Sequence, residues 1–206
     1  MTWRRAVVVG ASGGIGRALS EALEKNGTEV VRLSRSAEGS GRIDLEDEAS
    51  IAQAADSVSD GGDVDLVLVA SGILAPDEIG PEKSWRGIDP AAMARVFAVN
   101  AIGPALVAKH FVPLLPKDRR SAFAVLGARV GSIGDNRLGG WYSYRASKAA
   151  LAQIVRLVDE AQGSRAEVQR LAEHPQVAKL VPLSLGDNLQ GFRIVGTTPD
   201  YAAHYR

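Results

Sequence analysis

The chain has 206 residues and a mass of 21.7 kDa, enough for one domain with an appendage but not for two large domains. Its 24 Lys and Arg balance 24 Asp and Glu, which argues against a strongly basic nucleic-acid binder. The lack of cysteine excludes disulfides, thiolate metal sites and a thiol nucleophile, and three scattered histidines predict no metal cluster. We expect no membrane span and no signal peptide, and therefore a cytoplasmic protein.

Apolar runs and helical spacing alternate along the chain. Apolar runs predict strands at 6–9, 29–33, 41–45, 64–70 and 122–126. Apolar residues at helical spacing predict helices at 15–25, 46–58, 90–111 and 141–160. Gly103–Pro104 predicts a kink in the third of these helices. The alternation predicts an α/β fold: a doubly wound parallel sheet of the Rossmann type, with helices on both faces.

Three glycines, at positions 10, 14 and 16, stand between the first predicted strand and the first predicted helix. Glycine permits a tight turn, lets the backbone approach a pyrophosphate and lets the helix pack close to the strand. The free N–H groups at the positive end of the helix then face the anion. This pattern predicts a dinucleotide phosphate cradle; the plainer interpretation is a turn that only joins strand to helix. The residues assigned to the cradle are Gly10, Ser12, Gly13, Gly14, Ile15 and Gly16.

The end of the second predicted strand selects between NAD and NADP. An acidic side chain there would bind the ribose 2′-hydroxyl, but the strand ends Leu33-Ser34-Arg35 without an acid. A guanidinium suits a 2′-phosphate through paired hydrogen bonds. We therefore predict NADP rather than NAD, with Ser34 and Arg35 as cofactor residues. The alternative is that Arg35 is a solvated surface charge.

Tyr144 and Lys148 lie four residues apart on the last predicted helix. An i, i+4 pair projects from one face of a helix, so a phenol and an ammonium can act on the same ligand. The ammonium favours the phenolate, which would lower the pKa of Tyr144 and bring proton exchange within reach of neutral pH. Because such a pair also arises by chance, its weight depends on the motifs around it.

Three motifs occur together and in order: the glycine pattern, Asn100-Ala-Ile-Gly103 and Tyr144-x-x-x-Lys148. With these motifs the chain resembles the short-chain dehydrogenase/reductase family over residues 5–154. Residues 65–72 and 131–148 are most similar to its C-factor-like, cell-signalling branch. The resemblance implies an oxidoreductase that transfers a hydride between NADP(H) and a carbonyl or secondary alcohol.

The resemblance also implies roles for individual residues. Tyr144 would exchange a proton with the substrate oxygen, Lys148 would hydrogen-bond the nicotinamide ribose, and Asn100 would help hold a water in the proton path. Asp44 and Leu45 match positions that contact adenine. The segment after the fourth predicted strand is expected to contact the cofactor through Ala70, Ser71 and Gly72.

Two motifs depart from the family pattern. The family's serine pair aligns with Gly127-Ala128, which carry no hydroxyl. We assign the hydroxyl that orients the carbonyl to Ser132, which precedes Tyr144 by 12 residues; the alternative is an ordinary loop serine. The family's Asn-Asn-Ala-Gly element is Val69-Ala70-Ser71-Gly72 here, so Ser71 would replace part of the hydrogen bonding of the missing asparagine.

The chain departs most from the family beyond about residue 154, where no Pro-Gly turn follows. We therefore expect a Rossmann-like domain over residues 1–160 and an atypical or truncated C-terminal segment over 161–206. Apolar runs at 178–183 and 192–195 have the length to add strands to the sheet. The sequence over 180–201 resembles a segment of the extracytoplasmic domain of macrolide-exporter-type ABC permeases.

Two classes of function remain open. The first is the NADP-dependent oxidoreductase, whose partner is a small-molecule carbonyl or alcohol, with no metal, nucleic acid or membrane. The alternative is a non-catalytic dinucleotide-binding protein, or a truncated or fused reductase that lacks a complete substrate pocket. The resemblance further implies a homo-oligomer paired through the two long helices.

Overall fold

The computed structural model describes residues 3–134, 139–161, 185–189 and 192–195. Its centre is a four-stranded parallel sheet in the order β2-β1-β3-β4. The strands are β1 (Arg5–Val9), β2 (Glu29–Leu33), β3 (Leu66–Val69) and β4 (Ala122–Val125). Every residue of β1 is buried, as a central strand covered on both faces requires.

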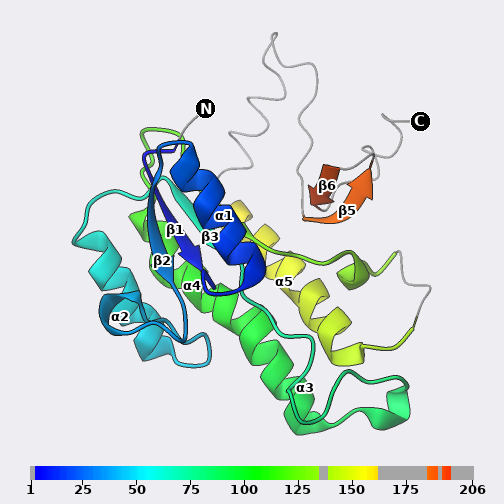
Figure 1. The fold of residues 1–206 in the computed structure, drawn as a ribbon. Coiled ribbons are helices and arrows are strands. Elements are labelled where there is room, and N and C mark those ends of the chain that lie inside the picture. Colours follow the sequence, from blue (N-terminus) through cyan, green and yellow to red (C-terminus); the bar gives the residue numbers. More distant parts are fainter. Residues whose placement is uncertain (1–2, 135–138, 162–184, 190–191, 196–206) are drawn as a thin grey trace.

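Helices cover both faces of this sheet (Figure 1). One face carries α1 (Gly14–Lys25), while α4 (Gly103–Phe111) and α5 (Tyr142–Ala161) lie behind the sheet in this view. The remaining helices are α2 (Glu48–Ser59), which packs against α4, and α3 (Pro90–Phe97), which packs against α5. The predicted doubly wound α/β fold is therefore confirmed.

The predicted helix 90–111 is divided into three segments. A π-helical turn, Ala98–Ile102, separates α3 from α4 and ends just before the predicted kink at Gly103–Pro104. Proline has no N–H, so Pro104 cannot donate to the carbonyl of Asn100 four residues earlier, and the regular α-helical ladder is interrupted there. The widened turn holds Asn100, which is fully buried.

The 25-residue stretch Pro90–Leu114 is long and apolar enough to cross a membrane by length and composition, since an 18-residue window within it has a mean hydropathy of 1.6. The expectation of no membrane span stays a prediction. Within the fold, however, Val107 and Phe111 of this stretch are completely buried in the core, where they pack with residues of β1, β2 and β3. The hydropathy of this stretch therefore matches a core helix.

The predicted strand at 41–45 does not form; the segment makes only an isolated bridge between Ser34 and Arg42. Two local features turn the chain away from the sheet. A 3₁₀ turn occupies Gly39–Gly41, and the Asp44 carboxylate accepts a hydrogen bond from the Glu46 amide two residues later.

The C-terminal segment contributes a separate hairpin, in which β5 (Leu185–Leu189) pairs antiparallel with β6 (Phe192–Val195). The predicted strand at 192–195 thus exists, but it pairs with β5 and does not extend the parallel sheet. The run 178–183 lies outside the described residues. The division of the chain at residue 160 stays a prediction.

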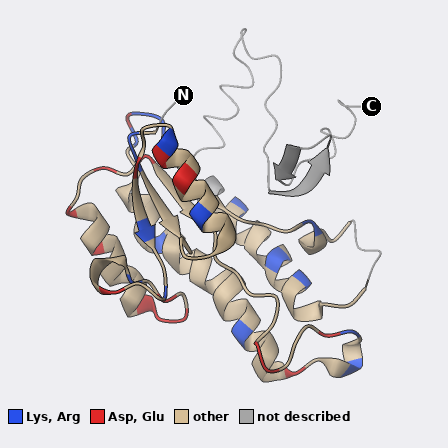
Figure 2. Cartoon of the chain, in the orientation of Figure 1, with Lys and Arg blue, Asp and Glu red and all other residues tan. Residues whose placement is uncertain are grey.

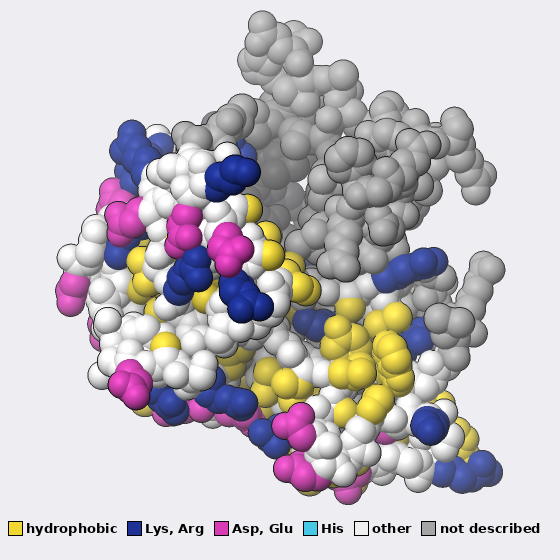
Figure 3. All heavy atoms as spheres, viewed as in Figure 1, with side chains coloured by type: hydrophobic (Ala, Val, Ile, Leu, Met, Phe, Trp, Pro, Cys, Tyr) yellow, Lys and Arg dark blue, Asp and Glu magenta, His cyan; other side chains and the backbone are white. Residues whose placement is uncertain are grey.

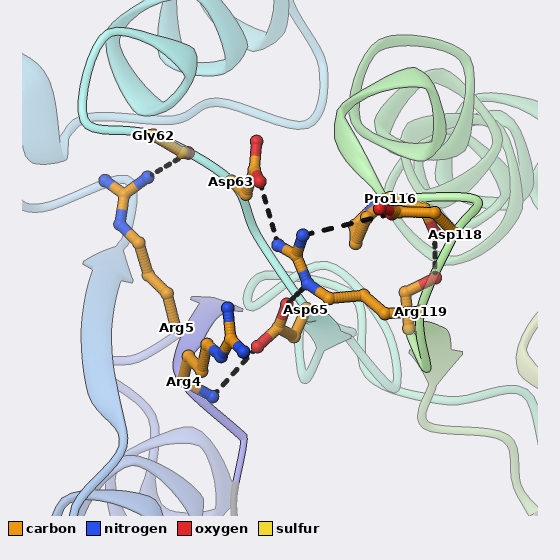
Figure 4. Close-up of polar contacts among 9 residues, drawn as sticks. Arg4, Arg5, Gly62, Asp63, Asp65, Pro116, Asp118 and Arg119 are labelled. Carbon is orange, nitrogen blue, oxygen red and sulfur yellow. Dashed lines mark hydrogen bonds and ion pairs between the residues drawn. The ribbon is translucent and has the colours of Figure 1, made fainter.

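The amino edge of the sheet is held together by ion pairs (Figure 4). Asp65 is buried and accepts hydrogen bonds from the Arg4 amide at 2.9 Å and the Arg119 guanidinium at 3.1 Å. Arg119 also binds Asp63, and Arg5 donates to the carbonyls of Val58 and Gly62. These contacts tie β1, the start of β3 and the segment before β4 together at the amino edge.

Candidate active site

The glycine turn has the geometry that a phosphate cradle needs. Gly10 has a φ of +86°, and a Cβ there would lie 2.5 Å from the Ser71 Oγ. A Cβ on Gly16 would lie 2.2 Å from the carbonyl oxygen of Gly10, so glycine lets α1 pack directly on the turn. The first turn of α1 contains no acidic residue, and residues 12–15 are exposed. The positive end of α1 is therefore open to an anion.

The end of β2 presents two guanidinium groups. Arg35 is exposed and pairs with no carboxylate of the described residues, while Ser34 is buried beneath it. Arg42 donates to the carbonyl of Arg35 at 2.9 Å and lies 3.8 Å from the Asp44 carboxylate. The structure thus places the Arg35 guanidinium at the end of β2, and its role in selecting the cofactor stays a prediction.

Three site residues meet where β3 ends. A Cβ on Gly72 would lie 3.2 Å from Asn100 Oδ1 and 3.3 Å from Lys148 Nζ, so glycine permits this close approach. The Asn100 side chain accepts from the Ile73 amide and donates to the Ile73 carbonyl, both at 2.8 Å, and donates to Ser147 Oγ at 3.1 Å. Its amide therefore fixes the backbone after β3 against α5, and its role in holding a water stays a prediction.

Lys148 is almost fully buried and donates to the Leu126 carbonyl at 2.8 Å. Burial lowers the pKa of Lys148 to about 8. Its Nζ lies 5.9 Å from the centroid of the Tyr144 ring. Burial also raises the pKa of Tyr144, so the predicted lowering of that pKa is wrong.

Ser132 directly follows Gly131, which packs against Lys148. It is exposed and lines a cavity of about 420 Å³ together with Tyr142 and Arg145, while Tyr144 is not among the described residues that line it. Within the predicted group, Gly72 lies against Asn100 and Lys148, and the Tyr144 ring lies beside Lys148. The assignment of the carbonyl-orienting hydroxyl to Ser132 stays a prediction.

The predicted adenine contacts occupy the turn after the missing strand. Leu45 is buried, and a Cβ on Gly103 would lie 2.7 Å from the Leu45 Cβ, so this leucine packs against the start of α4. Asp44 is half-buried beside Arg42. Ala70 and Ser71 continue from β3 into Gly72, with Ser71 against Gly10.

Two further residues of the site were not predicted from the sequence. Ser147 is a buried residue of α5. Its Oγ accepts a hydrogen bond from Asn100 and donates one to the Tyr144 carbonyl at 2.8 Å. Gly131 lets the loop after β4 contact α5, because a Cβ there would lie 2.8 Å from the Lys148 Cβ. The sequence shows that Ser147 lies between Tyr144 and Lys148, but it does not show that Asn100 is its partner. Only the fold brings these two residues together.

The surface near this site is largely apolar. Hydrophobic side chains gather over α5 and over the junction of α3 and α4 (Figure 3). Charged residues are distributed over several helices and loops without a broad face of one sign in this view (Figure 2). Among the described residues, no group of three or more His, Asp or Glu side chains is arranged to hold a metal ion.

A family model described as short chain dehydrogenase matches residues 4–172. The chain belongs to the short-chain dehydrogenase family, as the motifs indicated.

Curated relatives differ in how much of the chain they match. It is 31% identical over 179 residues to the 1-hydroxy-2-glutathionyl-2-methyl-3-butene dehydrogenase of Rhodococcus sp. (strain AD45), covering 82% of this chain and 75% of that protein. It is 44% identical over 69 residues to the C-signal of Myxococcus xanthus, covering 34% of this chain and 42% of that protein. It is 27% identical to the 3-oxoacyl-[acyl-carrier-protein] reductase FabG of Escherichia coli (strain K12), covering 71% of this chain and 62% of that protein.

Solved structures share the fold. An NADPH-bound carbonyl reductase from chicken fatty liver superposes with a TM-score of 0.67 at 25% identity, covering 81% of this chain and 72% of that one. An NADP-bound short-chain dehydrogenase/reductase from Burkholderia multivorans superposes with a TM-score of 0.68 at 24% identity, covering 79% of this chain and 74% of that one. The chain thus belongs to a family of NAD(P)-dependent oxidoreductases, and it spans less than two thirds of the length of some relatives that it matches.

Proposed function

We propose that this chain uses NADP(H) to interconvert a small carbonyl compound and a secondary alcohol, with Tyr144 as the proton donor and acceptor. One observation carries the proposal. The phosphate cradle and the Tyr144–Lys148 pair form one continuous group, because Gly10 lies against Ser71 and the next residue, Gly72, lies against Lys148. A dinucleotide bound by the cradle would therefore extend to the phenol.

The residues have separable tasks in such a reaction. Bound NADPH would supply the hydride. Tyr144 would donate the proton of its Oη to the substrate oxygen, and burial keeps this phenol protonated at neutral pH because it raises the pKa. Lys148 has three N–H donors, of which one binds the Leu126 carbonyl, so two remain to orient the ribose beside Tyr144. Asn100 and Ser147 hold the backbone of both segments in place.

The preference for NADP over NAD rests on Arg35. Its guanidinium is exposed at the end of β2, pairs with no carboxylate of the described residues and is available for a 2′-phosphate. The substrate is a carbonyl or secondary alcohol of unspecified structure. The similarity to the C-signal over 69 residues supports a place in the C-factor-like branch.

The direct test is turnover by the full chain. We expect oxidation of NADPH, followed at 340 nm, with at least one member of a panel of aldehydes, ketones and 3-oxoacyl thioesters, and a lower kcat/KM with NADH. Binding of neither nucleotide in calorimetry would refute the proposal. Equal use of NADH and NADPH would refute only the assignment of cofactor preference.

A second candidate is a dinucleotide-binding protein without catalysis. It is favoured by the missing hydroxyl at Gly127-Ala128. Without a hydroxyl beside the phenol, the substrate carbonyl would lose one hydrogen-bond donor that polarises it. Tight NADPH binding with no turnover across the whole panel would select this candidate.

A further inference from the structure

Glu82, in the loop between β3 and α3, bonds to the start of α5. Its carboxylate accepts hydrogen bonds from the Ser143 hydroxyl and from the Ser143 amide, the latter at 3.3 and 3.4 Å. Its backbone carbonyl accepts from the Trp141 amide at 2.6 Å. Both contacts involve residues at the start of α5. Ser143 lies 61 residues after Glu82 in the sequence.

The chain that leads into α5 has a conformation that needs such support. Gly139, Gly140 and Trp141 all have positive φ, and Trp141, with a φ of 53°, is the only described non-glycine residue that does. A bulky side chain in this region is strained and persists only where its surroundings fix it. A Cβ on Gly140 would lie 3.3 Å from the Glu82 carbonyl oxygen, so glycine there lets the loop approach.

The negative charge of Glu82 also suits its position. The first N–H groups of a helix have no partners within the helix, and an anion at this end is favoured by the helix dipole. Ser143 is buried and Glu82 half-buried, so the contact is shielded from solvent. The cavity between the loop and α3, lined by Glu82 and Ser143 among others, has room for about 10 Å³. The loop is therefore packed closely against the helix.

Tyr144 is the residue that this arrangement holds. It directly follows Ser143, and its ring meets the Trp141 ring edge to face, with centroids 6.4 Å apart and planes at 81°. Its carbonyl accepts from Ser147 on the inner side of the helix. The first turn of α5 is thus held by Ser147, by the bond from Arg145 to the Gly139 carbonyl, and by Glu82, which reaches it from a distant loop.

We propose that Glu82 is a positioning residue for Tyr144: it holds Trp141 and Ser143, and through them sets the place of the phenol at the reaction centre. The expected effect of Glu82 on kcat rests on the proposed function. Its effect on the position of Tyr144 does not. Lys148 lies one turn further on and binds Leu126, so cofactor affinity should not depend on Glu82.

The test compares Glu82→Ala and Glu82→Gln with Glu78→Ala, which removes an exposed acid of the same loop that makes no hydrogen bond to α5 among the described residues. In Glu82→Ala we expect kcat to fall at least tenfold while the Kd for NADPH, measured by calorimetry, stays within twofold. Glu82→Gln keeps an acceptor oxygen and should recover part of kcat. Glu78→Ala should match the wild type.

A second measurement does not require turnover. The absorbance difference at 295 nm between each protein and its Tyr144→Phe version isolates the titration of the Tyr144 phenol. In Glu82→Ala a frayed first turn hydrates the phenol, so its midpoint should fall toward the ordinary value for tyrosine. An unchanged midpoint with unchanged kcat would overturn the inference, as would a parallel loss of NADPH binding in Glu82→Gln. If the wild type shows no turnover, the proposed function fails while the titration still decides the role of Glu82.

Discussion

The two edges of the parallel sheet use charged groups in opposite ways. At the amino edge, Asp65 is buried and fully engaged by the Arg4 amide and by Arg119 (Figure 4). At the carboxyl edge, the buried Lys148 donates to one backbone carbonyl, and α1 begins with no acidic residue in its first turn. The amino edge neutralises its charges internally, whereas the carboxyl edge keeps hydrogen-bond donors for a ligand.

This contrast separates stability from function along one set of strands. Paired buried charges hold the ends of β1 and β3 together, and breaking one pair leaves a buried charge uncompensated. Donors directed at an open edge contribute little to the fold, but they supply the positive environment that a dinucleotide requires. Variants at the amino edge should therefore change unfolding, and variants at the carboxyl edge should change binding or turnover.

The largest expected effect is that of Tyr144→Phe on turnover. Removal of the proton donor should lower kcat by about 10²–10⁴-fold, the usual contribution of general acid catalysis. Because only a hydroxyl is lost from a half-buried ring, the Tm and the Kd for NADPH should stay close to wild type. Tyr142→Phe, two residues earlier in the same helix, is the control and should retain activity. Undiminished turnover in Tyr144→Phe would show that the carboxyl edge does not use this phenol.

The next effect concerns the glycine turn. Gly16→Ala places a Cβ 2.2 Å from the carbonyl oxygen of Gly10, so α1 must shift. Overpacking of this kind costs about 1–3 kcal/mol, and urea unfolding of the apoprotein should show it together with weaker NADPH binding. Gly14→Ala is the matched control, since a Cβ there meets no heavy atom within 4 Å and alanine is a better helix former. Equal loss of stability in both variants would contradict the close-packing argument.

The sequence predicted the helices and strands that depend on apolar patterns and on residues at helix ends. The predicted and observed bounds of β2 agree at residues 29–33, and α1 begins one residue before the predicted Ile15. That helix ends where predicted because Gly27 adopts a φ of +80° after the Asn26 cap. The cluster of Tyr144, Lys148 and Asn100 was predicted from the resemblance to the family, whose motifs occur here in the same order.

The parts that the sequence did not predict depend on contacts between distant segments. The π-helical turn needs Pro104 and the bonds of Asn100 to Ile73 and Ser147, which no periodicity reveals. Glu82 sits in a loop without periodicity, so its contact with Ser143 had no local pattern to indicate it. The strand predicted at 41–45 shows the same limit, because its apolar pattern does not reveal that it pairs with Ser34 alone.

Asp65→Asn tests the amino edge. Burial opposes ionisation, but the Arg4 amide and Arg119 together hold the pKa of Asp65 below its usual value. A lowered folded pKa stabilises the protein above the unfolded pKa, about 3.9, and this contribution is lost as pH falls through the folded pKa. Asp65→Asn should therefore lower the free energy of unfolding by about 1.5–3 kcal/mol at pH 7, and the gap to wild type should narrow in acid.

The control for Asp65 is Asp118→Asn. Asp118 is 84% exposed and lies 3.9 Å from Arg119, so its loss should cost less than about 1 kcal/mol. NADPH binding and kcat should be unchanged in both variants, because these residues lie at the opposite edge from Tyr144. A loss of turnover in folded Asp65→Asn would break the proposed separation between the two edges.

The smallest effect, and the most specific, is expected from Arg35→Ala. Loss of a guanidinium that binds a 2′-phosphate should raise the Kd for NADPH about tenfold, equal to about 1.4 kcal/mol, and leave the Kd for NADH unchanged. Because Arg35 is exposed and pairs with no carboxylate of the described residues, the Tm should not move. Lys25→Ala, which removes a positive charge from the far end of α1, controls for net charge. If both nucleotides lose affinity equally, Arg35 acts on the pyrophosphate through its general positive field, and the selection of NADP must be sought in Arg42 beside it.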